Sequence, residues 1–335
     1  MRKYLVTGGA GFIGSNFVKY LYKTEKDIQV VVLDKLTYSG NLDNLKDVME
    51  REDFQFVKGD ICDKELVDKV MKDVNVVVNF AAEVAVDRSI DNKESFLYTD
   101  IIGVHVLMES VLKYRENIER YIQISTDEVY GHILEGSFTE ESPLNPRNPY
   151  AASKLGGERL AYSYYATYNL PVIITRASNN YGPWAYPEKM IPLFITNLAE
   201  GFTVPVYGDG MQIRDWLYVE DHCEAIHMLI NKGKNGEVYN VGGGQEITNL
   251  ELTRKIISLV GGEESSIVFV KDRPGHDLRY SLSCEKMNKI GWTPKHKLEE
   301  GLKETVNWYL LHQDYWKDLK ANMDKRYIKG FWNDK

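Results

Sequence analysis

The chain has 335 residues, a formal net charge of −8 and a hydrophobic content of 43%, which is typical of a folded globular protein of one or two domains. The acidic balance argues against nucleic acid as the main partner, because a protein that binds nucleic acid usually carries a basic face. No run of about 18 apolar residues is present, so we expect no membrane-spanning helix.

The first half of the chain alternates short apolar runs with longer amphipathic stretches. Strands are predicted at 4–7, 29–33, 54–57, 74–80, 121–125 and 172–175, and helices at 14–23, 64–71 and 95–113. Strands that are apolar on both faces and separated by helices predict an α/β protein with a doubly wound parallel sheet.

The second half has a different character. Residues 179–210 are rich in Gly, Pro, Asn and aromatic side chains, so we expect loops that build a binding site on a rigid scaffold. A helical pattern returns at 298–311 and is followed by a charged and aromatic end, 314–335. No repeat or flexible linker separates the halves, which we expect to pack as one unit with a cleft between them.

A glycine-rich turn joins the first predicted strand to the first helix. Gly8, Gly11 and Gly14 form a GxxGxxG pattern, which permits a tight turn and the close approach of a pyrophosphate to the helix N-terminus. Asp34 follows the last glycine by 20 residues, at the end of the second strand, where a carboxylate can accept hydrogen bonds from both ribose hydroxyls and repels a 2′-phosphate. The pattern therefore predicts NAD rather than NADP, although Lys35 could tolerate a phosphate.

Two further strand ends carry candidate cofactor contacts. Asp60 and Ile61 follow the third strand, where a structural turn and an adenine contact are both open interpretations. Ala81, Ala82 and Glu83 follow the fourth strand, and their small side chains would let a dinucleotide lie close above the sheet.

The fifth strand and the segment after it carry the candidate catalytic residues. Thr126 ends the strand, and Tyr150 and Lys154 are four residues apart, so they lie on one face of a helix. We expect the cation of Lys154 to lower the pKa of Tyr150 from its ordinary value of about 10. Such a tyrosine can take the proton of a substrate alcohol while hydride leaves the same carbon for a nicotinamide.

These residues resemble the extended short-chain dehydrogenase/reductase superfamily, and within it the dTDP-glucose 4,6-dehydratase family. The resemblance extends over nearly the whole chain. It rests on the motifs at 34–38, 87–90, 126–131, 178–183, 213–222 and 272–277. The adjacent acids Asp127 and Glu128 are its most specific element, because relatives that only epimerise C4 generally lack them.

The resemblance implies a Rossmann-type NAD-binding domain at 1–177, completed by parts of 213–240 and 300–318, and a smaller, mainly nucleotide-sugar-binding domain at 178–335. It also implies a reaction in which C4 is oxidised, water is lost across C5 and C6, and hydride returns to C6. In that reaction Glu128 is the C5 base, Asp127 is the C6 acid, and Thr126 contacts the C4 oxygen. The acid has to stay protonated, which burial and a neighbouring carboxylate promote.

The same resemblance implies the remaining contacts. The implied cofactor contacts are Gly8, Gly11, Phe12, Ile13, Gly14, Asp34, Lys35, Thr37, Asp60, Ile61, Ala81, Ala82, Glu83, Tyr150 and Lys154. The substrate contacts are Val84, Thr126, Asn179, Lys189, Met190, Pro205, Tyr207, Arg214, Asn249, Arg273, His276 and Tyr280. Among these, Arg214 and Arg273 are expected to clamp the diphosphate, since two phosphates require cations.

The chain departs from the family pattern at three positions. Val84 and Ala85 stand where the family carries a small hydroxyl residue and His, so the usual polar contact to the hexose is missing. Asp100 stands where the family usually carries Asn near the nicotinamide.

Other functions remain open from the sequence. The sequence hardly distinguishes a dehydratase that acts on UDP-glucose from one that acts on dTDP-glucose. The two adjacent acids disfavour a UDP-sugar C4 epimerase and a UDP-glucuronate decarboxylase. A non-enzymatic NAD-binding sensor has little use for the full catalytic set.

Partners and location follow the same reasoning. We expect a homodimer through a four-helix bundle built from 95–113 and 150–168, as the family forms, and the second segment is too rich in tyrosine for a solvated face. Cys62, Cys223 and Cys284 are far apart and suggest neither disulfides nor a metal site. We expect no metal, nucleic-acid or membrane partner, and a cytoplasmic location.

Overall fold

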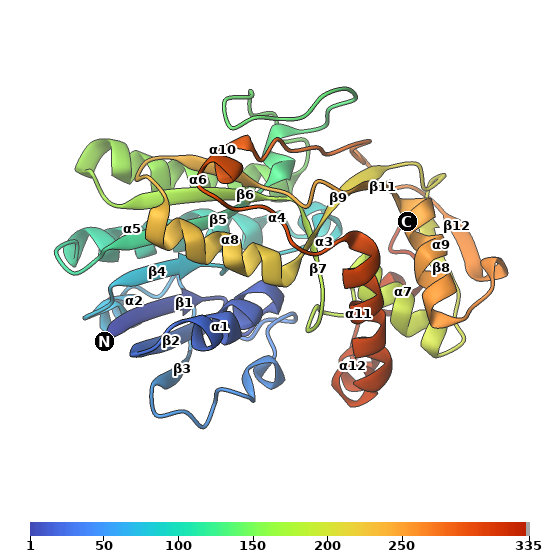
Figure 1. The fold of residues 1–335 in the computed structure, drawn as a ribbon, viewed down its shortest axis with the longest axis horizontal. Coiled ribbons are helices and arrows are strands. Elements are labelled where there is room, and N and C mark those ends of the chain that lie inside the picture. Colours follow the sequence, from blue (N-terminus) through green and yellow to red (C-terminus); the bar gives the residue numbers. More distant parts are fainter. Residues whose placement is uncertain (333–335) are drawn as a thin grey trace.

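The computed structural model describes residues 1–332 and is built around a seven-stranded sheet with the order β10-β6-β5-β4-β1-β2-β3 (Figure 1). Each pair of neighbouring strands in it is parallel. The strands are β1 Arg2–Thr7, β2 Ile28–Asp34, β3 Phe54–Lys58, β4 Val76–Asn79, β5 Arg120–Thr126, β6 Val172–Ala177 and β10 Val238–Val241. All six strands predicted from the sequence are present, and the predicted doubly wound α/β fold is confirmed.

Helices cover both faces of this sheet (Figure 1). The helices α1 (Phe12–Thr24) and α8 (Val219–Lys232) pack together on one face. The helices α2 (Lys64–Met71), α5 (Val104–Lys113) and α6 (Pro149–Tyr168) cover the other. Because both faces are covered, β2 reads as an apolar run, Ile-Gln-Val-Val-Val-Leu-Asp, whose residues are buried on both sides.

The strand order reverses beside β1. The chain moves outward through β2 and β3 on one side and through β4, β5 and β6 on the other. In open parallel sheets, ligands bind beyond the carboxyl ends of the strands at such a switch point. The turn after β1 and the strand ends of β4 and β5 therefore mark the place for the functional site.

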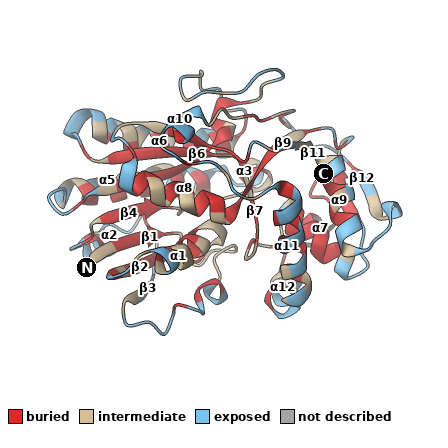
Figure 2. Cartoon of the chain, in the orientation of Figure 1, coloured by how far each residue is buried: buried red, intermediate tan, exposed pale blue. Residues whose placement is uncertain are grey.

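A smaller unit from the second half of the chain lies beside the carboxyl ends of the sheet (Figure 1). Its helices α7 (Met190–Ala199), α9 (Asn249–Val260) and α11 (Leu298–Leu311) enclose a core that contains many aromatic side chains. Its strands are β7 Asn179–Tyr181, β8 Val204–Tyr207, β9 Ile213–Tyr218, β11 Glu246–Thr248 and β12 Ile267–Val270. Figure 2 shows buried residues concentrated in the sheet and in the inner helices of this unit.

Shorter helices complete the described chain. The helices α3 (Val86–Asp91) and α4 (Lys93–Leu97) lie near the carboxyl end of the sheet. The helices α10 (Glu285–Lys289), α12 (Gln313–Ala321) and α13 (Lys325–Lys329) lie toward the C-terminal end of the described chain. The 3₁₀ helices are Leu42–Leu45, Asp127–Tyr130 and Glu264–Ser266.

The prediction that 179–210 is mostly loop is wrong in part, because α7 lies within it. Its sequence is apolar nearly all round and seven of its ten residues are buried, so no polar face interrupts the run to reveal a helical period. Pro192 lies in the first turn of α7, where its missing N–H has no partner to lose.

The segment predicted as one helix at 95–113 is divided. It runs from α4 through a π-helical stretch, Tyr98–Gly103, into α5. The continuous stretch Lys93–Lys113 has a mean hydropathy of 1.3 over 18 residues and is long enough to cross a membrane. We had expected no helix of this length and hydropathy from the sequence. Half of those 18 residues are buried inside the protein. Core helices of globular proteins can have the same length and hydropathy.

The π-helical stretch touches α6 through two adjacent glycines. A Cβ atom on Gly157 would overlap the backbone carbonyl of Asp100, whereas one on Gly156 would meet the Cδ1 atom of Ile101 at 2.6 Å. A backbone carbonyl cannot move aside, but the end of a side chain can. The residue at 157 is therefore required to be glycine for α6 to approach the π-helical stretch this closely.

We predict that Gly157→Ala lowers the free energy of unfolding by about 1–3 kcal/mol, the usual cost of overpacking. Gly156→Ala on the same helix is the matched control. It is expected to be neutral or stabilising by up to about 1 kcal/mol, because alanine favours helix more than glycine does. Urea unfolding followed by circular dichroism measures both, and equal effects of the two substitutions would contradict the close-contact argument.

Candidate functional site

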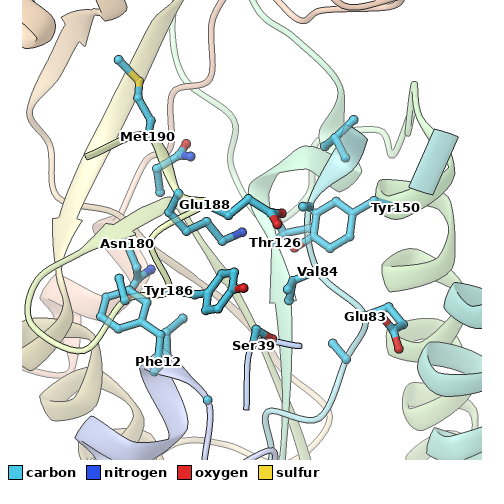
Figure 3. Close-up of a pocket in the computed structure, with 18 of the residues that line it drawn as sticks. Phe12, Ser39, Glu83, Val84, Thr126, Tyr150, Asn180, Tyr186, Glu188 and Met190 are labelled. Carbon is cyan, nitrogen blue, oxygen red and sulfur yellow. The ribbon is translucent and has the colours of Figure 1, made fainter. Parts of the chain in front are cut away.

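One cleft lies beyond the carboxyl ends of β1, β2, β4, β5 and β6 and is closed on its far side by the smaller unit (Figure 3). Every residue assigned from the sequence to the cofactor, the substrate or catalysis lines this cleft. The structure thus brings together side chains from position 8 to position 280. Their individual roles remain predictions.

The glycine-rich turn forms one end of the cleft. Gly8 has φ of +67°, and a Cβ atom on it would lie 2.6 Å from the backbone nitrogen of Ala81. A Cβ atom on Gly14 would lie 2.8 Å from Gly9 Cα. The N-terminus of α1 begins at Gly11 without a side-chain cap, so the first N–H groups of this helix, from Phe12 onward, are open to an anion.

Asp34 at the end of β2 is held against this turn. Its carboxylate accepts hydrogen bonds from the backbone N–H of Ala10 at 2.9 Å and of Leu36 at 2.8 Å, and burial raises its pKa. Lys35 pairs with Asp60, at 2.7 Å between Nζ and Oδ2. Since this cation is already neutralised, the acidic side chain decides the ribose preference, and the arrangement fits NAD.

The candidate catalytic residues lie where β5 ends. Thr126 caps the 3₁₀ helix that follows, because its hydroxyl accepts a hydrogen bond from Glu128 N at 3.3 Å. The same hydroxyl donates to Asp127 Oδ1 at 3.2 Å. This cap places the two adjacent acids in fixed positions at the end of the strand, and Figure 3 shows Thr126 beside Tyr150.

Asp127 is 2% exposed, and its Oδ2 atom has no hydrogen-bond partner among the described residues. Burial raises its pKa well above the ordinary value, and the negative charges of Glu128 and Asp215 raise it further. Asp215 itself is held by the backbone N–H groups of Gly243 and Gln245. The arrangement favours the protonated carboxylic acid over the carboxylate at this position.

Tyr150 and Lys154 share the buried face of α6, as predicted, but their electrostatics differ from the expectation. The Lys154 amino group is buried and donates to the Ile124 carbonyl at 2.8 Å. The pKa of Tyr150 is raised well above 10 by burial and by the charges of Glu128 and Asp100. The prediction that Lys154 lowers this pKa is therefore wrong in this structure, where only a hydrogen bond with Thr126 favours the phenolate.

Asp100, in the π-helical stretch, faces the same region. Its carboxylate accepts hydrogen bonds from the Ser153 hydroxyl at 2.6 Å and from Glu83 N at 3.1 Å. It is 3% exposed. Burial raises its pKa to about 6, against the opposing effects of the Lys154 charge and the Ser153 hydrogen bond. An acid thus joins α6 to the strand end after β4.

The other end of the cleft carries positive charge. Arg214 on β9 is buried, stacks over the ring of Tyr280 with its Cζ atom 4.3 Å from the centroid, and donates to Asp277 O. The pKa of His276 is lowered to about 3 by burial and by the charges of Arg273 and Arg214. A neutral histidine beside two converging cations forms a site suited to an anionic group such as a diphosphate.

The remaining predicted residues come from several elements. Thr37 lies after β2, and Ile61, Ala82 and Glu83 lie at strand ends of the sheet. Asn179 begins β7, Lys189 precedes α7, and Met190 begins it, whereas Pro205 and Tyr207 belong to β8 and Asn249 begins α9.

The two departures after β4 form a wall of the cleft. Val84 lies close to Thr126 and Tyr150 in Figure 3, and its backbone carbonyl accepts a hydrogen bond from the Tyr38 hydroxyl at 3.0 Å. Ala85 has φ of +75°, a conformation that a non-glycine residue adopts only at a cost. This part of the cleft wall is therefore apolar and lies at a strained turn.

Several cleft residues were missed by the sequence reasoning. One of them, Tyr186, comes from the loop before α7. Asp215 is buried and does not line the cleft, but its charge raises the pKa of Asp127, and nothing in the sequence indicated this role. Tyr327 and Gly330 come from the C-terminal segment, which is anchored by hydrogen bonds such as that from Trp332 Nε1 to Asp87 Oδ1 at 2.6 Å. The concentration of aromatic residues at 327–332 is the signal that could have indicated packing against the site.

Within residues 1–332, no cluster of three or more His, Cys, Asp or Glu side chains could hold a metal ion.

We predict that Asp100→Asn stabilises the protein in a pH-dependent manner. The pKa of Asp100 is raised from 3.8 to about 6 in the folded state, so ionising this carboxyl costs folding free energy, and that cost grows as pH rises from about 4 to about 6. Removing the carboxyl should therefore raise the free energy of unfolding by roughly 2–3 kcal/mol at pH 7 relative to pH 4. Urea unfolding of both proteins across this range measures the difference, and a constant difference would contradict the burial effect.

Comparison with known proteins agrees with this geometry. The family profile described as GDP-mannose 4,6 dehydratase matches residues 5–305. The chain is 52% identical to the low-salt glycan biosynthesis protein Agl12 of Haloferax volcanii, over 91% of this chain and 98% of that protein. It is 48% identical to a dTDP-glucose 4,6-dehydratase of Streptomyces niveus, over 95% and 96%. The solved dTDP-glucose 4,6-dehydratase of Bacillus anthracis, in complex with NAD, superposes with a TM-score of 0.89 at 50% identity and covers 95% of this chain and 100% of that one. The chain therefore belongs to the GDP-mannose 4,6-dehydratase family.

Proposed function

We propose that this protein is a dTDP-glucose 4,6-dehydratase, a hydro-lyase that converts dTDP-glucose to dTDP-4-keto-6-deoxy-glucose with NAD as its catalytic cofactor. The observation that carries the proposal is the buried Asp127, whose raised pKa favours the protonated acid, next to Glu128 at the end of β5, in the cleft that Thr126 and Tyr150 of α6 also line. The relatives that bear this name match nearly the full length of the chain.

The residues of the glycine-rich end fit NAD. Gly8 and Gly14 leave room for a pyrophosphate at the open N-terminus of α1, and Asp34 is placed for the adenosine ribose. When bound, NAD supplies the hydride acceptor for C4 of the sugar and the hydride donor for C6.

The residues at the end of β5 divide the proton transfers between them. Tyr150 takes the proton of the C4 hydroxyl during oxidation, and Thr126 holds the C4 oxygen by a hydrogen bond. The resulting ketone acidifies the C5 proton, which Glu128 removes. Asp127 gives its proton to the C6 hydroxyl, which leaves as water. The raised pKa of Asp127 keeps this proton available.

The raised pKa of Tyr150 has a consequence for the first step. Burial and the acids around it disfavour the phenolate, so the proton transfer depends on a positive charge nearby. Lys154, four residues along α6, is the candidate among the described residues, and its buried amino group is already fixed by the Ile124 carbonyl.

Two alternatives are less favoured. A C4 epimerase does not remove the C6 hydroxyl and therefore needs no acid to protonate it. A protonated Asp127 would have no use in that reaction. A UDP-glucose 4,6-dehydratase would use the same catalytic residues and differs only in the base that it recognises. The relatives named for dTDP-glucose favour thymine.

We further propose a homodimer through a four-helix bundle of the 95–113 and 150–168 segments. Support comes from the outward side chains of these segments, where Leu97, Tyr98, Ile102 and Tyr168 are between 44% and 63% exposed. We also propose that the NAD-binding domain is 1–177 completed by parts of 213–240 and 300–318, with 178–335 mainly binding the nucleotide sugar. The packing of α8 on the sheet and the pairing of β10 with β6 support the first of these completing segments. The free thiols of Cys62, Cys223 and Cys284 favour a cytoplasmic location.

We predict that the purified protein, incubated with NAD and dTDP-glucose in deuterated water, produces a C6 methyl signal with deuterium at C5. Proton NMR detects both, because proton removal at C5 exposes that carbon to solvent exchange. The same incubation with UDP-glucose is the comparison, and we expect it to be slower. If neither sugar yields a methyl signal while NAD is bound, the proposed function is wrong.

We predict that Asp127→Asn lowers the rate of methyl formation by about 100-fold or more, since an amide cannot replace a general acid. Deuterium should still enter at C5, because Glu128 remains in place. Glu128→Gln is the matched variant and should abolish both signals. Loss of C5 exchange in the Asp127 variant, with its fold intact by circular dichroism, would instead assign the base to Asp127.

A further inference from the structure

Asn148 lies immediately before α6 and is 8% exposed. Its side-chain oxygen accepts a hydrogen bond from Ala151 N at 2.8 Å, so it is the N-cap of the helix that carries Tyr150 and Lys154. Pro149 follows it and disfavours a helical conformation for the preceding residue. Asn148 is accordingly extended, with φ of −140° and ψ of 162°.

The other end of the Asn148 amide faces the catalytic acids. Its Nδ2 atom donates to Glu128 Oε2 at 3.1 Å. Because the cap bond requires an oxygen toward Ala151, the nitrogen has to point toward Glu128, and the amide cannot be reversed without losing both bonds.

Among the residues that the structure describes, no other side chain donates as short a hydrogen bond to this carboxylate. The Tyr280 hydroxyl lies 3.4 Å from the same oxygen, but its one proton is directed to Asp277 Oδ2 at 2.7 Å. The second oxygen, Oε1, receives no hydrogen bond from any residue within 1–332. One oxygen of Glu128 is therefore held and the other is left for a substrate.

We propose that Asn148 is a positioning residue that fixes Glu128 for removal of the C5 proton and couples its orientation to the N-terminus of α6. This inference rests on the proposed dehydratase function. The cap of the helix and the placement of the base are then parts of one interaction, so the residues for oxidation and for elimination keep a constant geometry relative to each other.

The rival explanation is that Asn148 only caps the helix, and Asn148→Ser separates the two. Serine caps helices about as well as asparagine, but its side chain is too short to reach Glu128. The melting temperature and the rate of hydride transfer to NAD should therefore stay close to those of the parent protein. The subsequent loss of the reduced-nicotinamide absorbance, which follows C5 deprotonation, should slow by about tenfold, as expected for a lost hydrogen bond to a charged group.

The pH dependence gives a second measurement. Glu128 is surrounded by Asp127 on its own turn, Tyr150 on α6, Lys189 before α7, Arg214 on β9, and Arg273 and Tyr280 in the segment after β12. Loss of a donor disfavours the ionised base, so the low-pH limb of the elimination rate should move to higher pH in Asn148→Ser. Asn148→Asp keeps the cap and opposes a carboxylate to Glu128, and its limb should move further in the same direction.

The experiment is a single turnover of dTDP-glucose by the NAD-loaded protein, with absorbance followed from low to high pH. Slower decay of the reduced nicotinamide in both cap-preserving variants, with unchanged formation, supports the proposal. Decay rates and pH profiles equal to those of the parent protein in the serine variant overturn it and leave Asn148 as a cap alone. Failure of the parent protein to form the C6 methyl product is a different result, because it removes the dehydratase function itself.

Discussion

The seating of α6 against the carboxyl end of β5 and against the π-helical stretch Tyr98–Gly103 is the interaction on which the site depends. Three neighbouring residues of this helix make the contact. Lys154 donates to the Ile124 carbonyl of β5, and Ser153 donates to the Asp100 carboxylate. Gly157 lets the backbone of α6 lie close to the backbone carbonyl of Asp100. Any outward movement of α6 would change the distance from Tyr150 to the strand end. The glycine therefore contributes to the position of Tyr150 although it does not line the cleft.

Burial of acids near few cations controls the protonation of this site. The pKa values of Asp100, Asp127 and Asp215 are all raised, with burial as the largest cause. Backbone and side-chain donors compensate Asp100 and Asp215, whereas one oxygen of Asp127 has no partner among the described residues. The proton thus remains on the acid that has the least hydrogen bonding. The same surplus of negative charge opposes ionisation of Tyr150, so one arrangement favours the elimination and makes the oxidation depend on a nearby positive charge.

Six of the seven strands of the sheet and many of the cleft residues follow from the sequence, but the contacts among those residues do not. Strands buried on both faces leave continuous apolar runs, and motif residues at strand ends must meet at one edge of a parallel sheet. The helix α7 escaped prediction because its burial on nearly all sides removes the periodic pattern. Asn148 acts on Glu128, 20 residues before it, and Asp215 acts on Asp127, 88 residues before it. Both effects depend on how the chain folds and leave no pattern in the local sequence. The pKa of Tyr150 depends on such contacts as well, and spacing along a helix could not reveal it.

The turn at Ala85 shows how other residues around the cleft support its apolar wall after β4. A positive φ at alanine costs about 1–2 kcal/mol, so the surroundings must impose it. Tyr38 bonds the carbonyl of Val84, and Arg88 stacks over Tyr38 while it pairs through two nitrogens with Glu188 of the smaller unit. This connection joins the sheet to the smaller unit across the site. The side chain that this turn presents to the cleft at Val84 is apolar, so under the proposed function the hydrogen bonds to the hexose come from other residues of the cleft.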